Sequence, residues 1–243
     1  MSNLLATTPE YRLAHAEAVR KLPMRLLFAF LYCAVLLAIL IGVSGEIRWT
    51  AAWLLSAAYF ADTAFYLIWG TARAPELLQE RARPKKNAKR WDLILMRGVY
   101  LPLFVSLLVV SALDRRFGWS WVSPALRVAA GGAALASCVW ITWVLYTNRF
   151  ASGVVRIQAD RGQTVVSTGP YRVVRHPMYL GNVFLFAGMP LILGSWFGLL
   201  LSASISAVFV LRITLEDKTL HDELEGYREY AQRVRYRLIP GIW

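Results

Sequence analysis

Residue types that bind ligands crowd into one short polar segment between two apolar stretches. Thirteen positions hold two Arg, one His, two Tyr, two Pro and two Gly, in the order Gly169-Pro170-Tyr171-Arg172-Val173-Val174-Arg175-His176-Pro177-Met178-Tyr179-Leu180-Gly181. A link between apolar stretches needs only enough polarity to stay hydrated. This density therefore indicates a binding site.

The spacing within this segment predicts a helix that starts at Pro177. Proline suits the first helical position, because the N–H that it lacks has no partner in the first turn. His176 then occupies the capping position. The free N–H groups and the positive end of the helix dipole favour an anion, and Arg172 and Arg175 strengthen that preference. The simpler alternative makes the two arginines membrane-interface anchors and His176 a plain cap.

A second polar cluster follows the last apolar stretch, in the order Arg212-Ile213-Thr214-Leu215-Glu216-Asp217-Lys218-Thr219-Leu220. Arg212 and Glu216 are four residues apart, so they share a helix face and are expected to pair. Ionisable groups at membrane depth are costly unless they are paired or functional. A purely structural ion pair is the alternative to a catalytic role. The basic, tyrosine-bearing tail after Gly226 is predicted to fold over a pocket or to lie on the membrane surface.

The elements that must position these clusters are membrane-spanning helices. Apolar residues make up 57% of the 243 residues and aromatic residues 13%, which is too apolar for a soluble domain. The sequence predicts an all-α, polytopic membrane bundle of about six spans, with a short C-terminal helical hairpin and a cytoplasmic C-terminal segment. The spans are expected at residues 26–43, 49–69, 93–113, 128–145, 177–193 and 196–215.

The fifth predicted span explains how the two clusters meet. It has about seventeen residues, roughly 26 Å at 1.5 Å per residue, and contains Pro190, so it is short for a bilayer core of about 30 Å. A tight hairpin with the sixth span would place His176 beside Arg212 and Glu216. Two motifs some forty residues apart would then form one site.

The basic residues predict the orientation of the chain. The link between residues 73 and 90 holds Arg73, Arg81, Arg83, Lys85, Lys86, Lys89 and Arg90, and five arginines lie in the 146–176 segment, whereas the opposite links hold few. This asymmetry places both termini, the 146–176 segment and the active site in the cytoplasm. It also explains the net charge of +12 without nucleic acid as a partner. We expect one integral membrane domain over 1–243, with a four-span part at 1–145 and a part at 146–243 that carries both motifs.

Taken together, the motifs resemble the isoprenylcysteine carboxyl methyltransferase and phospholipid methyltransferase superfamily. The resemblance covers roughly residues 146–243. It rests on the order and spacing of the motifs from Gly169 to Gly181 and from Arg212 to Leu220, followed by a Gly-Tyr, Arg-Val and Ile-Pro tail. The superfamily usually has Glu-Glu where this chain has Glu216-Asp217. Residues 1–145 carry no pattern that matches.

This resemblance implies an enzyme that uses S-adenosylmethionine in a cytoplasmic pocket closed by the C-terminal segment. The acceptor would be a lipid or prenylated small molecule that arrives from the bilayer. Cofactor binding is assigned by this resemblance to Tyr171, Arg175, His176, Pro177, Tyr179, Leu180, Gly181, Glu216 and Asp217. Arg212, which could hold an anionic acceptor, and Glu216 are the predicted catalytic residues.

Two other functions remain open at this point. One is an NADPH-dependent membrane sterol or enone reductase, and the other is a non-catalytic helical scaffold. No metal is expected, because the sequence has no His/Cys set at metal-ligand spacing. The acceptor and the oligomeric state do not follow from the sequence.

Overall fold

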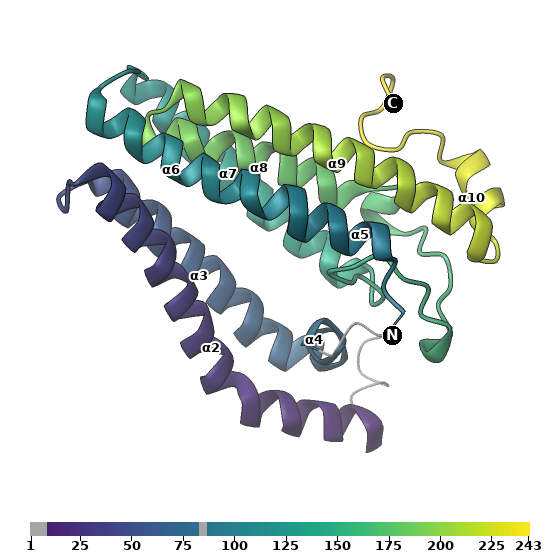
Figure 1. Cartoon of the computed structure of the whole chain (residues 1–243). Coiled ribbons are helices and arrows are strands. Elements are labelled where there is room, and N and C mark those ends of the chain that lie inside the picture. The colour runs from purple at the N-terminus through teal and green to yellow at the C-terminus, as the bar shows by residue number, and fades with distance from the viewer. Residues whose placement is uncertain (1–8, 83–86) are drawn as a thin grey trace.

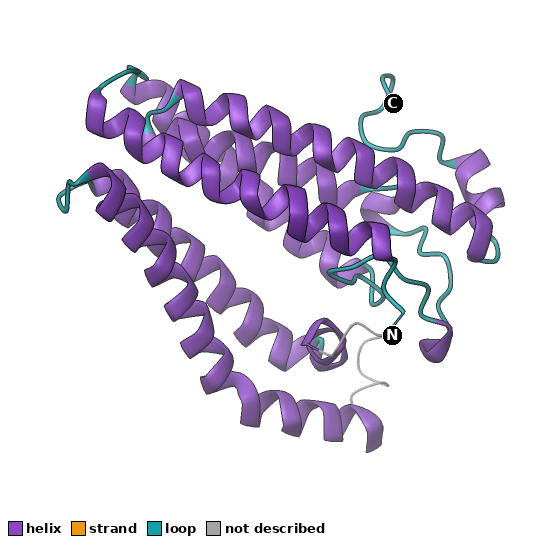
Figure 2. Ribbon diagram, in the orientation of Figure 1, coloured by secondary structure: helices purple, strands orange, loops and turns teal. Residues whose placement is uncertain are grey.

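The chain folds into helices joined by short links and one long segment. The structure is a computed structural model, and it describes residues 9–82 and 87–243. Within these residues every regular element is helical, as Figure 2 shows. The elements are α2 (Pro9–Ser44), α3 (Thr50–Arg73), α4 (Pro75–Ala82), α5 (Arg90–Ile94), a π-helical stretch (Leu95–Tyr100), α6 (Leu101–Phe117), α7 (Pro124–Thr147), two 3-10 turns (Ala159–Arg161 and Gly169–Arg172), α8 (Pro177–Leu193), α9 (Trp196–Glu223) and α10 (Tyr227–Arg233).

Five of the helical segments are long and apolar enough to cross a membrane. They are Tyr11–Ser44, Thr50–Arg73, Arg90–Phe117, Pro124–Thr147 and Trp196–Glu223. The sixth predicted span corresponds to α8, a shorter apolar helix of 17 residues. The predicted fold class, an all-α polytopic bundle with a short helical hairpin, is confirmed.

The helices α6, α7, α8 and α9 form the main bundle, and α7 and α8 pack closely along their length. In the view of Figure 1, the pair α2 and α3 runs at an angle to this bundle. A core of apolar side chains joins the two groups. Its buried members include Leu36 and Leu40 from α2, Leu107 from α6, and Ile205 and Phe209 from α9.

The hairpin between α8 and α9 follows from its sequence. Pro177 starts α8, and Gly194 ends it in the left-handed conformation with φ of +89°, which glycine adopts without strain. Ser195 then caps α9, because its Oγ accepts a hydrogen bond from the Gly198 N–H at 2.9 Å. Both clusters of interest therefore lie at the same end of the bundle, as predicted from the hairpin.

The opposite end of the bundle buries Asp114, which is only 1% exposed. Its carboxylate accepts hydrogen bonds from the Ser120 N–H and hydroxyl, both at 2.7 Å, and from the Ser195 hydroxyl at 2.5 Å. These bonds join the end of α6 to the start of α9. They stabilise the loops at the end of the bundle that is remote from the two motifs.

The orientation predicted from the basic residues stays a prediction, because no membrane accompanies the chain. Three of the residues that support it, Arg83, Lys85 and Lys86, lie outside the described residues. The placement of both termini and of the 146–176 segment in the cytoplasm rests on the charge pattern alone.

Candidate active site

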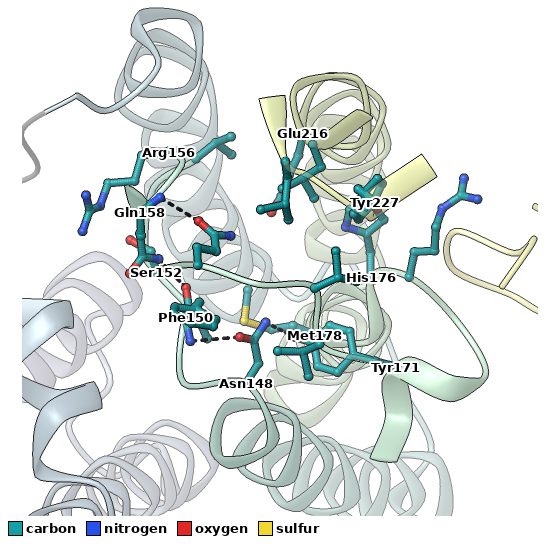
Figure 3. Close-up of a pocket in the computed structure, with 18 of the residues that line it drawn as sticks. Asn148, Phe150, Ser152, Arg156, Gln158, Tyr171, His176, Met178, Glu216 and Tyr227 are labelled. Carbon is teal, nitrogen blue, oxygen red and sulfur yellow. Dashed lines mark hydrogen bonds between the residues drawn. The ribbon is translucent and has the colours of Figure 1, made fainter. Parts of the chain in front are cut away.

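A pocket lies where the long 148–166 segment meets the ends of α8, α9 and α10. Its cavity volume is about 110 Å³, which is smaller than the roughly 300–1,000 Å³ that is typical of ligand pockets. Figure 3 shows Asn148, Phe150 and Gln158 on one side, with Glu216 and Tyr227 on the other. One wall is therefore a loop, and the other is made by helix ends.

The loop wall is held in shape by its own polar side chains. The Gln158 amide donates to the Phe150 carbonyl at 2.6 Å, and the Gln163 side chain accepts the Gln158 N–H at 2.7 Å. The Asn148 amide donates to the Tyr171 hydroxyl at 3.1 Å. Burial raises the pKa of Tyr171 to about 12, so its hydroxyl stays neutral at physiological pH.

Glu216 is the acidic side chain that lines the pocket. It is half-buried, and one carboxylate oxygen accepts a hydrogen bond from the Tyr179 hydroxyl at 2.7 Å. Tyr179 lies in the first turn of α8 and is 3% exposed. The hairpin therefore joins the two motifs directly, with a hydrogen bond between α8 and α9.

Asp217, the next residue along α9, has the opposite environment. It is 1% exposed and does not line the pocket. Its carboxylate pairs with Arg175 at 3.0 Å and Arg237 at 2.9 Å, and it contacts His176 Nε2 at 3.2 Å. The Tyr227 hydroxyl donates to the same carboxylate at 2.8 Å. The side chains of Arg175 and His176, which were expected beside a ligand anion, therefore contact the chain's own Asp217.

The C-terminal segment is fastened to the start of α8 by these contacts. The N–H groups of Arg175 and His176 donate to the carbonyls of Tyr236 and Arg237, at 3.0 and 2.9 Å. The Arg175 guanidinium also reaches three carbonyls between residues 231 and 235. The tail after residue 226 therefore folds back against this end of the bundle, which was one of the two arrangements expected from the sequence.

Arg212 is bound to a residue of the N-terminal half, and this corrects the expected pair with Glu216. Its guanidinium makes two hydrogen bonds to Asp92, at 2.6 and 3.1 Å, and both side chains are buried. The reason is geometric. Asp92 is fully buried at the start of the third span, where Arg212 satisfies it, while the Glu216 carboxylate turns toward the pocket and Tyr179.

Asp92 also holds the loop wall of the pocket. Its second oxygen accepts the Val155 N–H at 2.8 Å, and Arg212 donates to the Gly153 carbonyl at 3.2 Å. The Lys89 N–H donates to the Val155 carbonyl at 2.9 Å. The buried pair therefore links α5, α9 and the 148–166 segment.

Six of the predicted site residues line the pocket, namely Tyr171, Arg175, His176, Pro177, Tyr179 and Glu216. Four others do not. Arg212 and Asp217 lie behind the pocket in the buried networks described above, and Leu180 packs against the main core. Gly181 faces α7, where a Cβ would lie 2.6 Å from the Ile141 side chain, so close helix packing accounts for this glycine.

Sequence reasoning missed Asp92 and the polar loop residues such as Asn148 and Gln158. An acidic residue just before the apolar stretch at 93–113 was the available signal for Asp92. Nothing in the spacing of the loop residues distinguishes them from an ordinary link. Among the described residues, no group of three or more His, Cys, Asp or Glu could hold a metal ion.

Three comparisons with known proteins bear on this site. Residues 126–224 match the model of the phospholipid methyltransferase family. The cobalt-zinc-cadmium resistance protein CzcN of Cupriavidus metallidurans is 29% identical over 124 residues, which are 49% of this chain and 51% of that protein. The chain thus spans about half the length of this curated relative.

Among solved structures, a eukaryotic intramembrane Ras methyltransferase, isoprenylcysteine carboxyl methyltransferase, is similar with a TM-score of 0.49 and 14% sequence identity. The match covers 99% of this chain and 90% of that one. The family match spans nearly all of α7 and the whole of α8 and α9, together with the loop wall of the pocket. Residues 126–224 of this multi-pass membrane protein match the phospholipid methyltransferase family, and this match confirms the superfamily inferred from the motifs.

Proposed function

We propose that the chain is an S-adenosylmethionine-dependent methyltransferase that acts on a lipid-tailed acceptor. The observation that carries this proposal is the pocket itself. Its acidic side chain, Glu216, comes from the second motif, and its helix start at Pro177 comes from the first. Both motifs lie within the residues that match a methyltransferase family.

The residues of the pocket fit the charges of S-adenosylmethionine. The half-buried carboxylate of Glu216 suits an ammonium group, a sulfonium or ribose hydroxyls, and the neutral Tyr171 offers an aromatic surface for a cation. The polar loop residues Asn148 and Gln163 provide amides for further hydrogen bonds. The cofactor supplies an activated methyl group when it is bound.

The chain's own residues would align the reactants and exclude water. Methyl transfer would require this pocket to hold the acceptor and the methyl group in line and to keep water out. Orientation of the reactants can contribute about 7–11 kcal/mol to such a step. Tyr179 fixes the Glu216 carboxylate, and the Asp217 network fixes the C-terminal segment behind it.

A lipid-tailed acceptor is favoured because the pocket lies at the ends of apolar helices. A headgroup can reach this position while its tail remains in hydrocarbon. A carboxylate acceptor needs no general base, whereas an ammonium acceptor must first lose a proton. The guanidinium of Arg212, bound to Asp92, acts in this scheme by positioning the loop wall.

Binding and turnover should be tested in the same preparation. We expect S-adenosylmethionine, and not NADPH, to raise the melting temperature of the purified protein. Mass spectrometry of membrane lipids should detect a product heavier by one methylene. Stabilisation by NADPH alone would favour a reductase, and cofactor binding without a methylated product from any lipid would favour a non-catalytic scaffold.

The variant that tests the pocket is Glu216→Gln. Loss of a charge-assisted hydrogen bond costs about 1.5–3 kcal/mol, so the Kd for S-adenosylmethionine should rise about 10- to 100-fold in calorimetry. Glu223→Gln is the matched control, because Glu223 is exposed on the same helix and pairs with Lys89. Equal affinity in both variants would remove Glu216 from the cofactor site.

A further inference from the structure

Within residues 9–82 and 87–243, three buried polar atoms of the N-terminal helices have no hydrogen-bond partner and lie outside the pocket lining. They are Arg25 Nη1 on α2, the Tyr66 hydroxyl on α3 and Arg81 Nη1 on α4. Buried polar groups are nearly always hydrogen-bonded, so each of these needs an explanation. A bound ligand with acceptor oxygens would satisfy all three.

The three atoms belong to helices that meet at one place. The helix α4 packs against both α2 and α3, and Figure 1 shows it beside the end of α3. A Cβ on Gly70, one turn after Tyr66, would lie 3.2 Å from the methyl groups of Leu78. Arg81 follows Leu78 by less than one turn. The guanidinium groups of Arg25 and Arg81 both act electrostatically on the Tyr66 hydroxyl.

Two carboxylates near this place, Glu17 and Glu80, bind other side chains. Glu17 bonds to Lys21 and to the Gln79 amide, and Glu80 pairs with Arg156 at 2.7 Å. Among the residues that the structure describes, neither Arg25 nor Arg81 has an ion pair with a carboxylate. Two positive charges that act on the Tyr66 hydroxyl are therefore left without a carboxylate partner among these residues.

We propose that Arg25, Tyr66 and Arg81 bind a phosphate group. A guanidinium group forms two parallel hydrogen bonds to phosphate oxygens, and a tyrosine hydroxyl donates a further hydrogen bond. Arg25 comes just before the apolar part of α2, Tyr66 lies about two turns before the end of α3, and Arg81 lies on the short polar helix α4, an arrangement that suits the level of lipid headgroups. The phosphate of an anionic lipid is therefore the favoured source, and free phosphate shares the same chemistry.

This site does not depend on methyl transfer. It lies outside residues 126–224, and its occupancy can be measured without turnover. Failure of the methyltransferase proposal would leave the binding test intact, and failure of the binding test would leave the pocket unaffected.

The test compares two double variants of the full chain by native mass spectrometry in detergent. Arg25→Gln with Arg81→Gln removes both guanidinium groups, whereas Arg20→Gln with Arg73→Gln removes two exposed arginines from α2 and α3. We expect phosphatidylglycerol to bind the first variant about tenfold more weakly than the control, because charge-assisted hydrogen bonds are lost. Equal binding by the two double variants would overturn the proposal.

A second arm replaces the lipid with inorganic phosphate in a thermal-shift titration. Stabilisation of the wild type that the Arg25 and Arg81 variant lacks would identify free phosphate as a ligand as well. Stabilisation by phosphatidylglycerol alone would identify the lipid headgroup. The absence of any difference with either probe would overturn the site.

Two further measurements test whether the variants fold normally. Tyr66→Phe removes one donor without removing a charge, and should also weaken phosphatidylglycerol binding. Without added ligand, the Arg25 and Arg81 variant should melt no lower than wild type, because neither guanidinium has a carboxylate partner among the described residues. A lower melting temperature together with unchanged lipid binding would show a structural role and contradict the proposal.

Discussion

The two ends of the helical bundle each bury an aspartate, and they satisfy it with different partners. Asp114, at the end remote from the pocket, accepts hydrogen bonds from Ser120 and Ser195, which carry no charge. Asp217, at the pocket end, is paired with the guanidinium groups of Arg175 and Arg237. Both aspartates are 1% exposed, so burial alone does not distinguish them.

The origin of the partners distinguishes the two networks. The serine hydroxyls that donate to Asp114 join the loop after α6 to the start of α9, and these bonds are sufficient to hold a turn. The cations on Asp217 come from the segment before α8 and from the C-terminal tail, so that network fixes the position of segments around a pocket. A buried acid in a membrane bundle therefore indicates a site only when distant cations converge on it beside a cavity.

Removal of the charge at the pocket end should give the largest effect. In Asp217→Asn, Arg175 and Arg237 lose the carboxylate that they share, and breaking a buried ion pair costs about 3–5 kcal/mol. We expect the free energy of unfolding to fall by about this amount in denaturant titrations. A loss below about 1 kcal/mol would mean that the network is held by its backbone contacts.

Asp92→Asn should have a smaller effect on stability and a clear effect on activity. Arg212 would remain buried without its carboxylate, and the loop would lose its anchor at Val155. We expect a loss of about 3 kcal/mol in the free energy of unfolding. The rate of methyl transfer per folded molecule should also fall when it is measured well below the melting temperature. Full activity per folded molecule would contradict the positioning role.

Asp114→Asn is the matched change at the remote end. The asparagine retains one acceptor, so the loss is that of hydrogen bonds in a buried site, about 1–3 kcal/mol. We expect a lower melting temperature with unchanged affinity for S-adenosylmethionine in calorimetry. A loss of affinity for S-adenosylmethionine in Asp114→Asn would show that the two ends are coupled.

The sequence predicted the helices, the hairpin and the meeting of the two motifs, because each depends on local signals. Apolar stretches define the spans, and Pro177 and Gly194 define the ends of α8. The link between Tyr179 and Glu216 then follows from the hairpin. Sequence patterns can therefore predict contacts between helices that are joined by short links.

Sequence patterns could not predict the ion-pair partners of Arg212 and Asp217. Asp92 lies 120 residues before Arg212, and Arg237 lies in a tail whose direction no local signal specifies. The choice between Glu216 and Asp217 depends on the rotation of α9, which side-chain packing decides. The sequence therefore predicted which residues gather at this end, and packing determined which of them face the pocket.

The smallest expected effect concerns the hydrogen bond between the two motifs. Tyr179→Phe removes the hydroxyl that donates to Glu216 at 2.7 Å and keeps the ring that packs against Phe209. The carboxylate would remain in the pocket with one partner fewer, so its position becomes less defined while its charge is unchanged. A single hydrogen bond contributes about 1 kcal/mol, which corresponds to a roughly fivefold weaker affinity for S-adenosylmethionine in calorimetry.

Tyr236→Phe is the control, because Tyr236 is 40% exposed. In the double variant of Tyr179→Phe with Glu216→Gln, the two losses should not add, since both act through one carboxylate. Additive losses would show that Tyr179 contacts the cofactor independently of Glu216.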